Sequence, residues 1–329
     1  MIRRPTRQAG LRPARRSPNP GREHARLAVC LTGRDRWILH MVHEHRVLTT
    51  TQISALGFTH LDLARRRLAT LRDYGVLDRF RPLRTTGSAP SHWVLAPGGA
   101  AVLAAEAGLE VRDLHYRPDR ALAIAHSLHL AHTVGIAEWF TTLTAASLYR
   151  PDTSVLAWWS QTRCHALWGD LARPDAYGRY TRTGATLDFF LEFDLGTMAL
   201  PTVAAKLLGY ADLARTTGII TPILVWIPTA AREAAARKLL HDTWTRLPDP
   251  DAVPVATAPA ELLDPAAARP SPADRVWLPL TTSTRRSLHE LPAGWPRATT
   301  APATVPVPPA SRHALLAAPP PTAPGRGAR

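Results

Sequence analysis

The chain has 329 residues, of which 45% are hydrophobic, so it is long enough to bury the cores of two compact domains. Its formal net charge of +14 favours a polyanionic partner. The N-terminus lacks the apolar segment of a secretory signal, and the longest apolar run, Gly218 to Ile227, is shorter than the roughly 20 residues that span a bilayer. Cys30 and Cys164 lack the spacing of a metal site. We therefore expect a cytoplasmic protein with no membrane segment.

The positive charge is concentrated near the N-terminus. Residues 1–30 contain eight Arg and one Glu, and residues 31–100 contain ten Arg and five acids. Residues 126–265, in contrast, contain fourteen acids and eleven basic residues. Coding bias explains why most basic residues are Arg and not Lys. It does not explain why the middle of the chain has no excess of basic over acidic residues. The distribution predicts a basic N-terminal module that contacts a polyanion.

Residues 1–30 are rich in Arg, Pro and Gly and predict a disordered basic arm. Residues 31–98 predict three helices, because a threonine is followed three times by a residue that can complete a capping box. The pairs are Thr32 with Asp35, Thr49 with Gln52, and Thr59 with Asp62. Two strands follow, Val76 to Phe80 and His92 to Leu95, joined by a Pro- and Gly-containing turn. Three helices followed by a hairpin predict a winged helix-turn-helix.

The third predicted helix carries the strongest signal for DNA binding. An apolar stripe at helical spacing is formed by Leu61, Ala64, Leu68 and Leu71. Away from this stripe lie Arg65, Arg66 and Arg72, where a recognition helix meets the major groove. Three further arginines of the hairpin, Arg79, Arg81 and Arg84, are expected to grip the flanking phosphates. The alternative is an ordinary solvated face of a small helical domain.

The rest of the chain predicts a second domain between a linker and a tail. Residues 99–120 are expected to form a connecting helix and linker, and residues 121–265 an α/β domain around a mixed sheet. Its predicted elements are a long helix from Ala121 to Leu148, strands at Val155–Ser160, Ala172–Tyr177 and Leu187–Asp194, a helix at Leu200–Ala214, a strand at Ile219–Ile227 and a helix at Ala230–Trp244. Residues 266–329 predict a Pro-rich basic tail, largely disordered. The fold class is therefore α+β.

Carboxylates gather on one predicted strand. Glu192 and Asp194 share a face of the strand Leu187–Asp194, about 6–7 Å apart along the backbone. Asp175, near the preceding strand, is placed to join them. Three converging carboxylates are typical of a Mg²⁺ site for phosphodiester chemistry. The alternative is a strand end whose acids pair with Arg173, Arg179 or Lys206.

Several segments carry a family resemblance: Arg173-Pro174-Asp175-Ala176, Phe190 to Thr197, Lys206 with Leu207 and Tyr210, and His126 to Phe140. Through them the chain resembles the replication-relaxation family of plasmid and integrative elements. The resemblance implies a role in plasmid replication or DNA relaxation. The central domain in turn resembles the PD-(D/E)xK restriction-endonuclease fold, with Asp175 and Glu192 in the acidic positions. That pattern places a lysine two residues after the second acid, where this chain has Asp194, so Lys206 is the candidate displaced lysine.

Three functions remain open from the sequence. The first is a DNA-binding protein of a mobile genetic element that docks on duplex DNA through its winged helix. The second is a Mg²⁺-dependent endonuclease or nickase with Asp175, Glu192, Asp194 and Lys206 as catalytic residues and the three acids as metal ligands. The third is a transcriptional regulator with a non-catalytic central domain. Double-stranded DNA is the expected partner, together with replication or relaxase proteins or a second copy of the chain, and Mg²⁺ is the one candidate cofactor.

Overall fold

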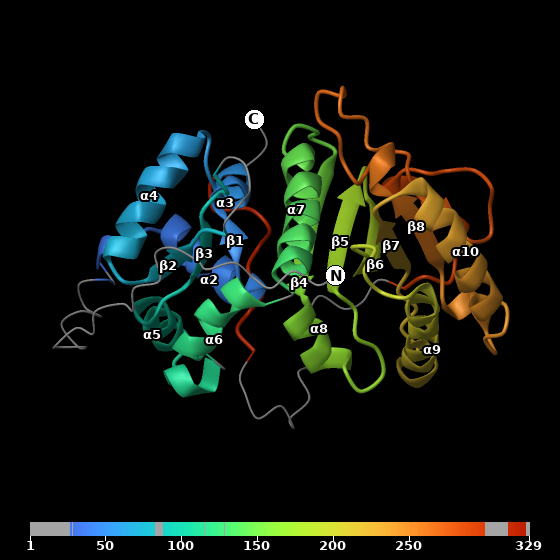
Figure 1. Ribbon diagram of the computed structural model, residues 1–329, viewed down its shortest axis with the longest axis horizontal. Helices are drawn as coiled ribbons and strands as arrows, with labels where there is room; N and C mark the ends of the chain where they lie inside the picture. The colour runs from blue at the N-terminus through green and yellow to red at the C-terminus, as the bar shows by residue number, and fades with distance from the viewer. Residues whose placement is uncertain are drawn as a thin grey trace. The chain divides into compact units, whose positions relative to one another are not determined.

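The computed structural model of the chain describes residues 27, 29–82, 88–114, 116–127, 129–299 and 315–326 (Figure 1). They fall into two units. Unit 1 comprises Met1–Thr141 and Ala310–Gly327, and unit 2 comprises Thr142–Pro309 and Ala328–Arg329. Both units combine helices with a sheet, which confirms the α+β class.

Unit 1 begins with three helices and a small antiparallel sheet. Its elements are α2 (Gly33–His45), β1 (Leu48–Thr49), α3 (Thr50–Gly57), α4 (Leu61–Asp73), β2 (Leu77–Phe80) and β3 (His92–Leu95). The strand order is β1-β3-β2, so that Trp93 on the central strand faces Leu48 on one side and Arg79 on the other. The Trp93 indole is buried and donates a hydrogen bond of 2.8 Å to the Thr50 hydroxyl, which ties the sheet to the start of α3.

Two of the three predicted capping boxes are present. Thr32 caps α2 together with Asp35, and Thr49 caps α3 together with Gln52. The third prediction is wrong, because α4 has His60 at its N-cap and no side-chain cap hydrogen bond. Thr59 therefore lies before the cap, while the Asp62 carboxylate accepts a hydrogen bond from Arg65.

The predicted long helix from Ala121 to Leu148 is interrupted. After α5 (Pro97–Glu106) and η1 (Val111–Leu114), the chain forms α6 (Pro118–Ala123), η2 (Ile124–His126) and α7 (Leu130–Ser147). The break occurs because Ser127 adopts an extended backbone with ψ of 138°, and its hydroxyl accepts a hydrogen bond from the His129 amide. The Ser127 hydroxyl thus bonds a backbone amide in place of a helical carbonyl, and α7 begins after it as a separate helix.

Unit 2 is built on a six-stranded mixed sheet. Its elements are β4 (Thr153–Ser160), α8 (Gln161–Trp168), β5 (Ala176–Arg182), β6 (Ala185–Phe193), α9 (Leu200–Thr217), β7 (Ile223–Ile227), α10 (Ala230–Trp244), η3 (Pro250–Ala252), β8 (Val255–Pro259), η4 (Ala260–Leu262), β9 (Leu278–Pro279), η5 (Leu288–Glu290) and η6 (Pro292–Gly294). The strand order is β4-β5-β6-β7-β8-β9. The strands β6, β7 and β8 run parallel to one another, and the other neighbours are antiparallel.

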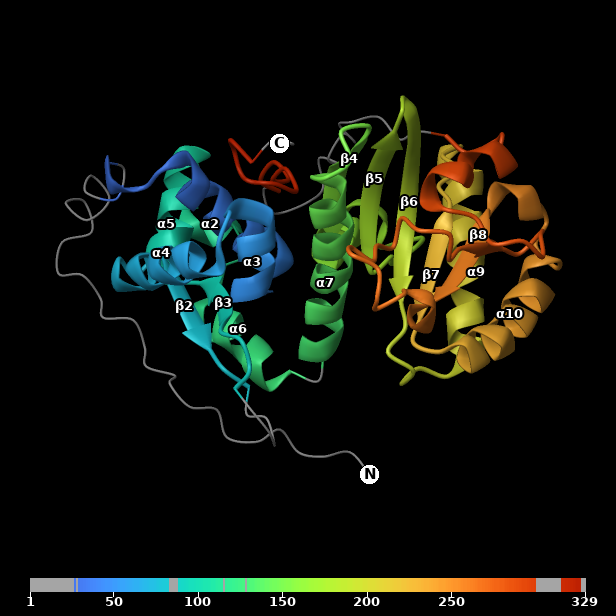
Figure 2. The ribbon, with the colours of Figure 1, turned by 90° about the horizontal axis from the view of Figure 1, so that it is seen from above.

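Three helices cover one face of this sheet, as Figures 1 and 2 show for α9 and α10 beside β7 and β8. One hydrophobic cluster joins Trp168 of α8, Leu207 of α9 and Leu240 of α10 to the strand residues Phe190 and Val225. The helices α9 and α10 also follow the parallel strands that they connect, as crossover helices do. This packing sets the position of α9 over β6, where the candidate acids lie.

Residues 266–299 belong to unit 2, where the sequence predicted a largely disordered tail. Trp277 is fully buried, its ring centroid lies 5.7 Å from that of Trp226 on β7, and Leu288 is also buried. Trp226 points to the face opposite the helix-covered one, since side chains alternate along a strand. The large apolar residues of this segment therefore complete a second layer, which its proline content conceals in the sequence.

A second part of the predicted tail, residues 315–326, packs on unit 1. The Trp37 indole donates a 2.8 Å hydrogen bond to the Pro320 carbonyl oxygen, and the Ala323 amide donates one of 3.2 Å to the Leu56 carbonyl oxygen. These contacts attach the segment to α2 and α3. The prediction of disorder is therefore also wrong for residues 315–326.

Within the described ranges, no helix is both long and apolar enough to cross a membrane. Neither Cys30 nor Cys164, both of which the structure describes, forms a disulfide bond.

Replacing Trp277 with Ala should lower the free energy of unfolding by about 3–5 kcal/mol, as is typical for a buried tryptophan. The loss is expected because the indole packs on Trp226 and donates a hydrogen bond to the Pro272 carbonyl oxygen. Urea unfolding followed by fluorescence measures it, with Leu262→Ala, at an exposed side chain, as the control. A loss below about 1 kcal/mol would show that residues 266–299 contribute little to unit 2.

Candidate functional site

The helix α4 presents arginines on its exposed face. Ala64, Leu68 and Leu71 are buried, so the apolar stripe faces the core of unit 1. Arg65 and Arg66 are exposed. Arg65 forms an ion pair of 2.9 Å with Asp62, but both side chains are largely in solvent, and such pairs contribute little stability. Both guanidinium groups are therefore accessible to a ligand.

The neighbouring Arg67 points inward and anchors α4 to α2. Its Nε lies 2.8 Å from Oδ1 of Asp35, its terminal nitrogen bonds the other carboxylate oxygen, and the same nitrogen donates to the Cys30 carbonyl oxygen. Asp35 is buried and also accepts hydrogen bonds from the amide and hydroxyl of Thr32. Burial raises the pKa of Asp35, but the hydrogen bonds from Arg67 and Thr32 outweigh it and hold this pKa below its ordinary value. The carboxylate is thus a charged anchor.

Three further predicted arginines form one positive group. Arg72 lies 4.0 Å from Asp78, the Arg79 guanidinium lies over the Trp93 ring at 5.7 Å, and Arg81 donates a 3.0 Å hydrogen bond to the Ser91 hydroxyl. Burial lowers the pKa of Arg79, and the charges of Arg72 and Arg81 lower it further. Arg72 and Arg81 therefore each lie close enough to Arg79 to act on its charge, with Asp73 and Asp78 opposing their effect. Arg84, the sixth predicted DNA-contacting residue, lies outside the described residues.

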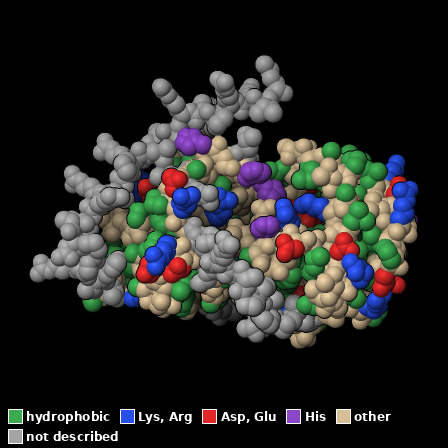
Figure 3. All heavy atoms as spheres, turned by 90° about the horizontal axis from the view of Figure 1, so that it is seen from below, with side chains coloured by type: hydrophobic (Ala, Val, Ile, Leu, Met, Phe, Trp, Pro, Cys, Tyr) green, Lys and Arg blue, Asp and Glu red, His purple; other side chains and the backbone are tan. Residues whose placement is uncertain are grey.

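Positive charge is not spread evenly over the surface. On the face drawn in Figure 3, Lys and Arg side chains alternate with Asp and Glu side chains and with apolar ones. A broad basic field is therefore absent from the described side chains of that face. The net charge therefore does not locate a binding surface. The candidate surface is located by the positions of two sets of arginines, Arg65 with Arg66 and the group of Arg72, Arg79 and Arg81.

In unit 2, the strand register brings two of the predicted acids together. Ala176 pairs with Leu191, so the next step of the antiparallel register places Asp175 beside Glu192 on the same face. Asp175 is buried and accepts hydrogen bonds from the Gln161 side chain at 3.3 Å and from the Phe193 amide at 2.9 Å. Two carboxylates thus lie side by side beneath α9.

The helix α9 supplies both hydrogen-bond donors to Glu192. Lys206 donates to Oε2 and Tyr210, one helical turn later, donates to Oε1. Burial raises the pKa of Glu192 to about 7, and the charge of Asp175 adds to this, against the opposing effects of Lys206 and Tyr210. Burial lowers the pKa of Lys206, but Glu192 and Asp175 raise it more, so its net pKa lies above the ordinary value. Lys206 is therefore the cation that balances this acid pair.

The third predicted acid has a different partner. Asp194 follows the last residue of β6, and its carboxylate bonds Nε of Arg232 through one oxygen. Its other oxygen accepts hydrogen bonds from Arg232 at 3.2 Å and from the Gly196 amide at 2.7 Å. The structure therefore brings Asp175, Glu192 and Lys206 together and pairs Asp194 separately with α10.

One comparison with known proteins identifies a family. The family model described as replication-relaxation matches residues 39–225, more than half of the chain. The chain belongs to the replication-relaxation family. No curated protein and no solved structure matches it. The matched range runs from within α2 through most of β7, so it contains both α4 and the acid pair with Lys206, and it ends before α10.

The acids of this replication-relaxation protein all have protein partners as they are arranged. Both oxygens of Glu192 and both of Asp175 already accept hydrogen bonds, and Asp194 is paired with Arg232. Among the described residues there is no group of three or more His, Cys, Asp or Glu side chains spaced to hold a metal ion. We therefore derive no metal-dependent step from this cluster.

Sequence reasoning missed several partners in these sites. It did not assign Arg67 to Asp35, nor Arg232 to Asp194, because these pairs are separated by 32 and 38 residues and leave no local pattern. The sequence indicated Tyr210 only through the family resemblance. The spacing of Lys206 and Tyr210, four residues apart on one helix, is the signal that would have placed both on the same face.

The raised pKa of Glu192 should make the stability of unit 2 depend on pH. The carboxyl titrates near 4.5 when unfolded and near 7 when folded, so the folded state binds more protons between these values. The free energy of unfolding should therefore fall by about 1–3 kcal/mol as the pH rises through this window.

Glu192→Gln should remove this part of the pH dependence, because Gln has no proton to release. Urea unfolding of both proteins at several pH values measures it, with Glu110→Gln, at an exposed side chain, as the matched control. The assignment fails if the wild type and the Glu192→Gln variant show the same pH slope.

Proposed function

We propose that this replication-relaxation protein docks on duplex DNA through unit 1, acting as a winged helix-turn-helix with α4 as the recognition helix. The order α2, β1, α3, α4, β2 and β3, with a β1-β3-β2 sheet, supports this fold assignment. In such proteins the second helix of the helix-turn-helix lies in the major groove. Here that helix is α4.

The observation that carries the proposal is that three consecutive arginines of α4 have different surroundings. Arg67 forms the internal bond to the buried Asp35, whereas Arg65 and Arg66 are exposed to solvent. Successive residues of a helix are separated by about 100°, so the orientation of Arg67 dictates where the other two point. Arginine forks suit phosphate oxygens and the O6 and N7 acceptors of guanine.

The group of Arg72, Arg79 and Arg81 supports the same surface. These residues come from the end of α4 and from β2 and the residue that follows it, and the charges of Arg72 and Arg81 act on Arg79. A phosphate backbone placed against them would offset the repulsion at Arg79 and release condensed counterions. We infer that this group contacts the backbone that flanks the groove occupied by α4.

Family membership supports a role in replication or DNA relaxation. We propose that the protein acts in this way on a mobile genetic element in the cytoplasm, with replication or relaxase proteins or a second copy of the chain as partners. Unit 2 then supplies an accessory surface. The helix–three-strand–helix–strand order from α7 to β7, interrupted by α8, supports a restriction-endonuclease-like ancestry for this unit.

We do not propose the endonuclease suggested by the sequence. Lys206 and Tyr210 donate hydrogen bonds to the Glu192 carboxylate, and Arg232 forms an ion pair with Asp194. The endonuclease therefore stays a prediction from the sequence, as does the transcriptional regulator, which would require a strong preference for one DNA site.

Replacing Arg65 and Arg66 together with Ala should weaken binding to a short duplex and flatten its dependence on salt. If each arginine neutralises one phosphate, the slope of log K against log salt should fall by about 0.9 for each residue. Fluorescence anisotropy at several salt concentrations measures the slope.

The matched control is the double variant Arg215→Ala with Arg246→Ala, which removes two exposed arginines from unit 2. It should retain the wild-type slope. An unchanged slope in the α4 variant, or an equal loss in the control, would remove the basis for α4 as the recognition helix.

A further inference from the structure

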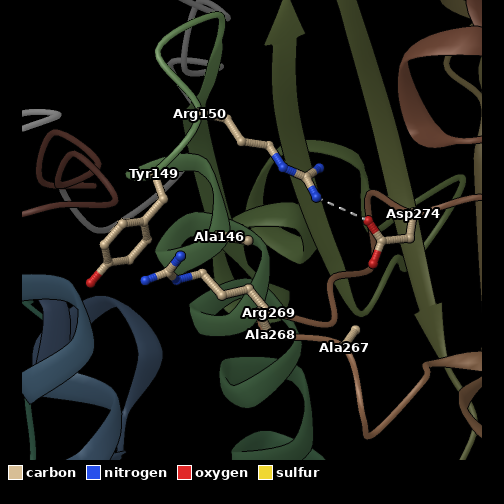
Figure 4. Close-up of a pocket in the computed structure, with 7 residues that line it drawn as sticks. All are labelled: Ala146, Tyr149, Arg150, Ala267, Ala268, Arg269 and Asp274. Atoms are coloured by element: carbon tan, nitrogen blue, oxygen red, sulfur yellow. Dashed lines mark hydrogen bonds and ion pairs between the residues drawn. The ribbon is translucent and has the colours of Figure 1, made fainter.

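A cavity of about 400 Å³ lies in unit 2 between the end of α7 and the chain that precedes β9 (Figure 4). The lining residues are Ala146, Tyr149, Arg150, Ala267, Ala268, Arg269 and Asp274. Three of these are alanines, which leave the space open, and the others are an aromatic residue, two arginines and one acid. Cavities of this size with a few polar groups are typical of ligand sites.

The aromatic residue and one arginine of this cavity form a close stack. The Arg269 guanidinium carbon lies 3.5 Å from the centroid of the Tyr149 ring, and Figure 4 shows it directed at that ring. Tyr149 is 57% exposed, so the pair is not part of a core. An exposed cation–π contact contributes only about 0.5–1 kcal/mol, whereas a base stacked on an aromatic ring contributes about 1–3 kcal/mol. A stacked base can therefore displace the Arg269 guanidinium from the Tyr149 ring and leave it available to a phosphate.

The second arginine is oriented by an acid that is itself held in place. The Asp274 carboxylate lies 3.4 Å from the Arg150 guanidinium and also accepts a 2.8 Å hydrogen bond from the Ser271 amide. The side chain of Arg150 remains 40% exposed. Two arginines and one aspartate leave the cavity with a net positive charge, which favours an anion.

We propose that this cavity binds one nucleotide of a single-stranded DNA, with its base stacked on Tyr149 and its phosphate between Arg150 and Arg269. An aromatic ring beside a guanidinium is the combination with which proteins hold unpaired bases without reading their sequence. A base inside a duplex cannot offer its face to Tyr149, because neighbouring bases cover that face. The single strand therefore fits the cavity, and the duplex does not.

This inference extends the proposed function, since it takes DNA as the partner, but it uses a different unit and a different form of DNA. Unit 1 would hold the duplex, and the cavity would hold a strand released when a duplex opens. Replication and relaxation both produce such a strand.

The test uses the full-length protein and a fluorescein-labelled oligothymidylate of about 12 nucleotides. Tyr149→Leu should weaken binding roughly 5- to 150-fold, the range expected from the loss of one stacked base. Tyr149→Phe should bind within about twofold of the wild type, because it keeps the ring. Arg269→Gln should flatten the salt slope by about 0.7, the contribution of one phosphate of a single strand.

Arg215→Ala, at an exposed arginine of unit 2 outside the cavity, is the matched control and should leave the slope unchanged. Thermal unfolding of each variant should show the wild-type midpoint, which separates a lost contact from a lost fold. The proposal is overturned if the wild type does not bind the oligothymidylate, if Tyr149→Leu binds it as the wild type does, or if Arg269→Gln keeps the wild-type slope.

A parallel titration with a short duplex separates this inference from the docking proposal. Tyr149→Leu should leave duplex binding unchanged, whereas the Arg65 and Arg66 double variant should weaken it. If that double variant binds duplex normally while Tyr149→Leu loses the single strand, the docking proposal fails and the cavity stands. The reverse result removes the cavity and keeps the docking proposal.

Discussion

The bond between Arg67 and the buried Asp35 determines what unit 1 presents to its surroundings. It joins α4 to α2, and it also draws in Thr32 and the Cys30 carbonyl oxygen. Removing one partner of a buried ion pair typically costs about 3–5 kcal/mol, because the other charge is left buried and unpaired. Together with the buried stripe of Ala64, Leu68 and Leu71, the bond sets the rotation of α4 about its own axis. This rotation leaves both Arg65 and Arg66 exposed.

The two units use their charges in opposite ways. In unit 2, acids under and beside the helices each have an internal cation: Lys206 for Glu192, Arg232 for Asp194 and Arg179 for Asp188. Each of these acids thus has a cationic partner within the unit. In unit 1, in contrast, only Arg67 among the consecutive arginines of α4 is committed to a buried acid. Cationic side chains thus pair with acids inside unit 2, whereas Arg65 and Arg66 of unit 1 stay exposed, as the proposed docking on DNA requires.

Local patterns in the sequence predicted the local structure well. The stripe of Ala64, Leu68 and Leu71 is buried on α4, the helix predicted at Ala230–Trp244 is α10, and the strand predicted at His92–Leu95 is β3. These elements follow from periodicity and capping, which involve residues only a few positions apart. The start of α4 shows the limit, since the N-cap is His60 and not the predicted Thr59.

Long-range partners could not be predicted in the same way. Whether Asp194 faces a metal or Arg232 depends on how α10 packs, and nothing near Asp194 in the sequence encodes that choice. The same holds for Trp277. The prolines around it predicted a disordered tail, but its ring packs on Trp226. The sequence placed Asp175 and Glu192 at adjacent predicted strands, so it predicted the acid pair. The hydrogen bonds from Lys206 and Tyr210 depend on the position of α9, which the sequence did not give.

Hydrogen–deuterium exchange of the full chain, with and without a short DNA duplex, tests the central claim most directly. If α4 enters the groove, its backbone amides and those of β2 should exchange more slowly in the complex, while α9 and α10 remain unchanged. Slower exchange confined to unit 2, with α4 exchanging as in the free protein, would contradict the account.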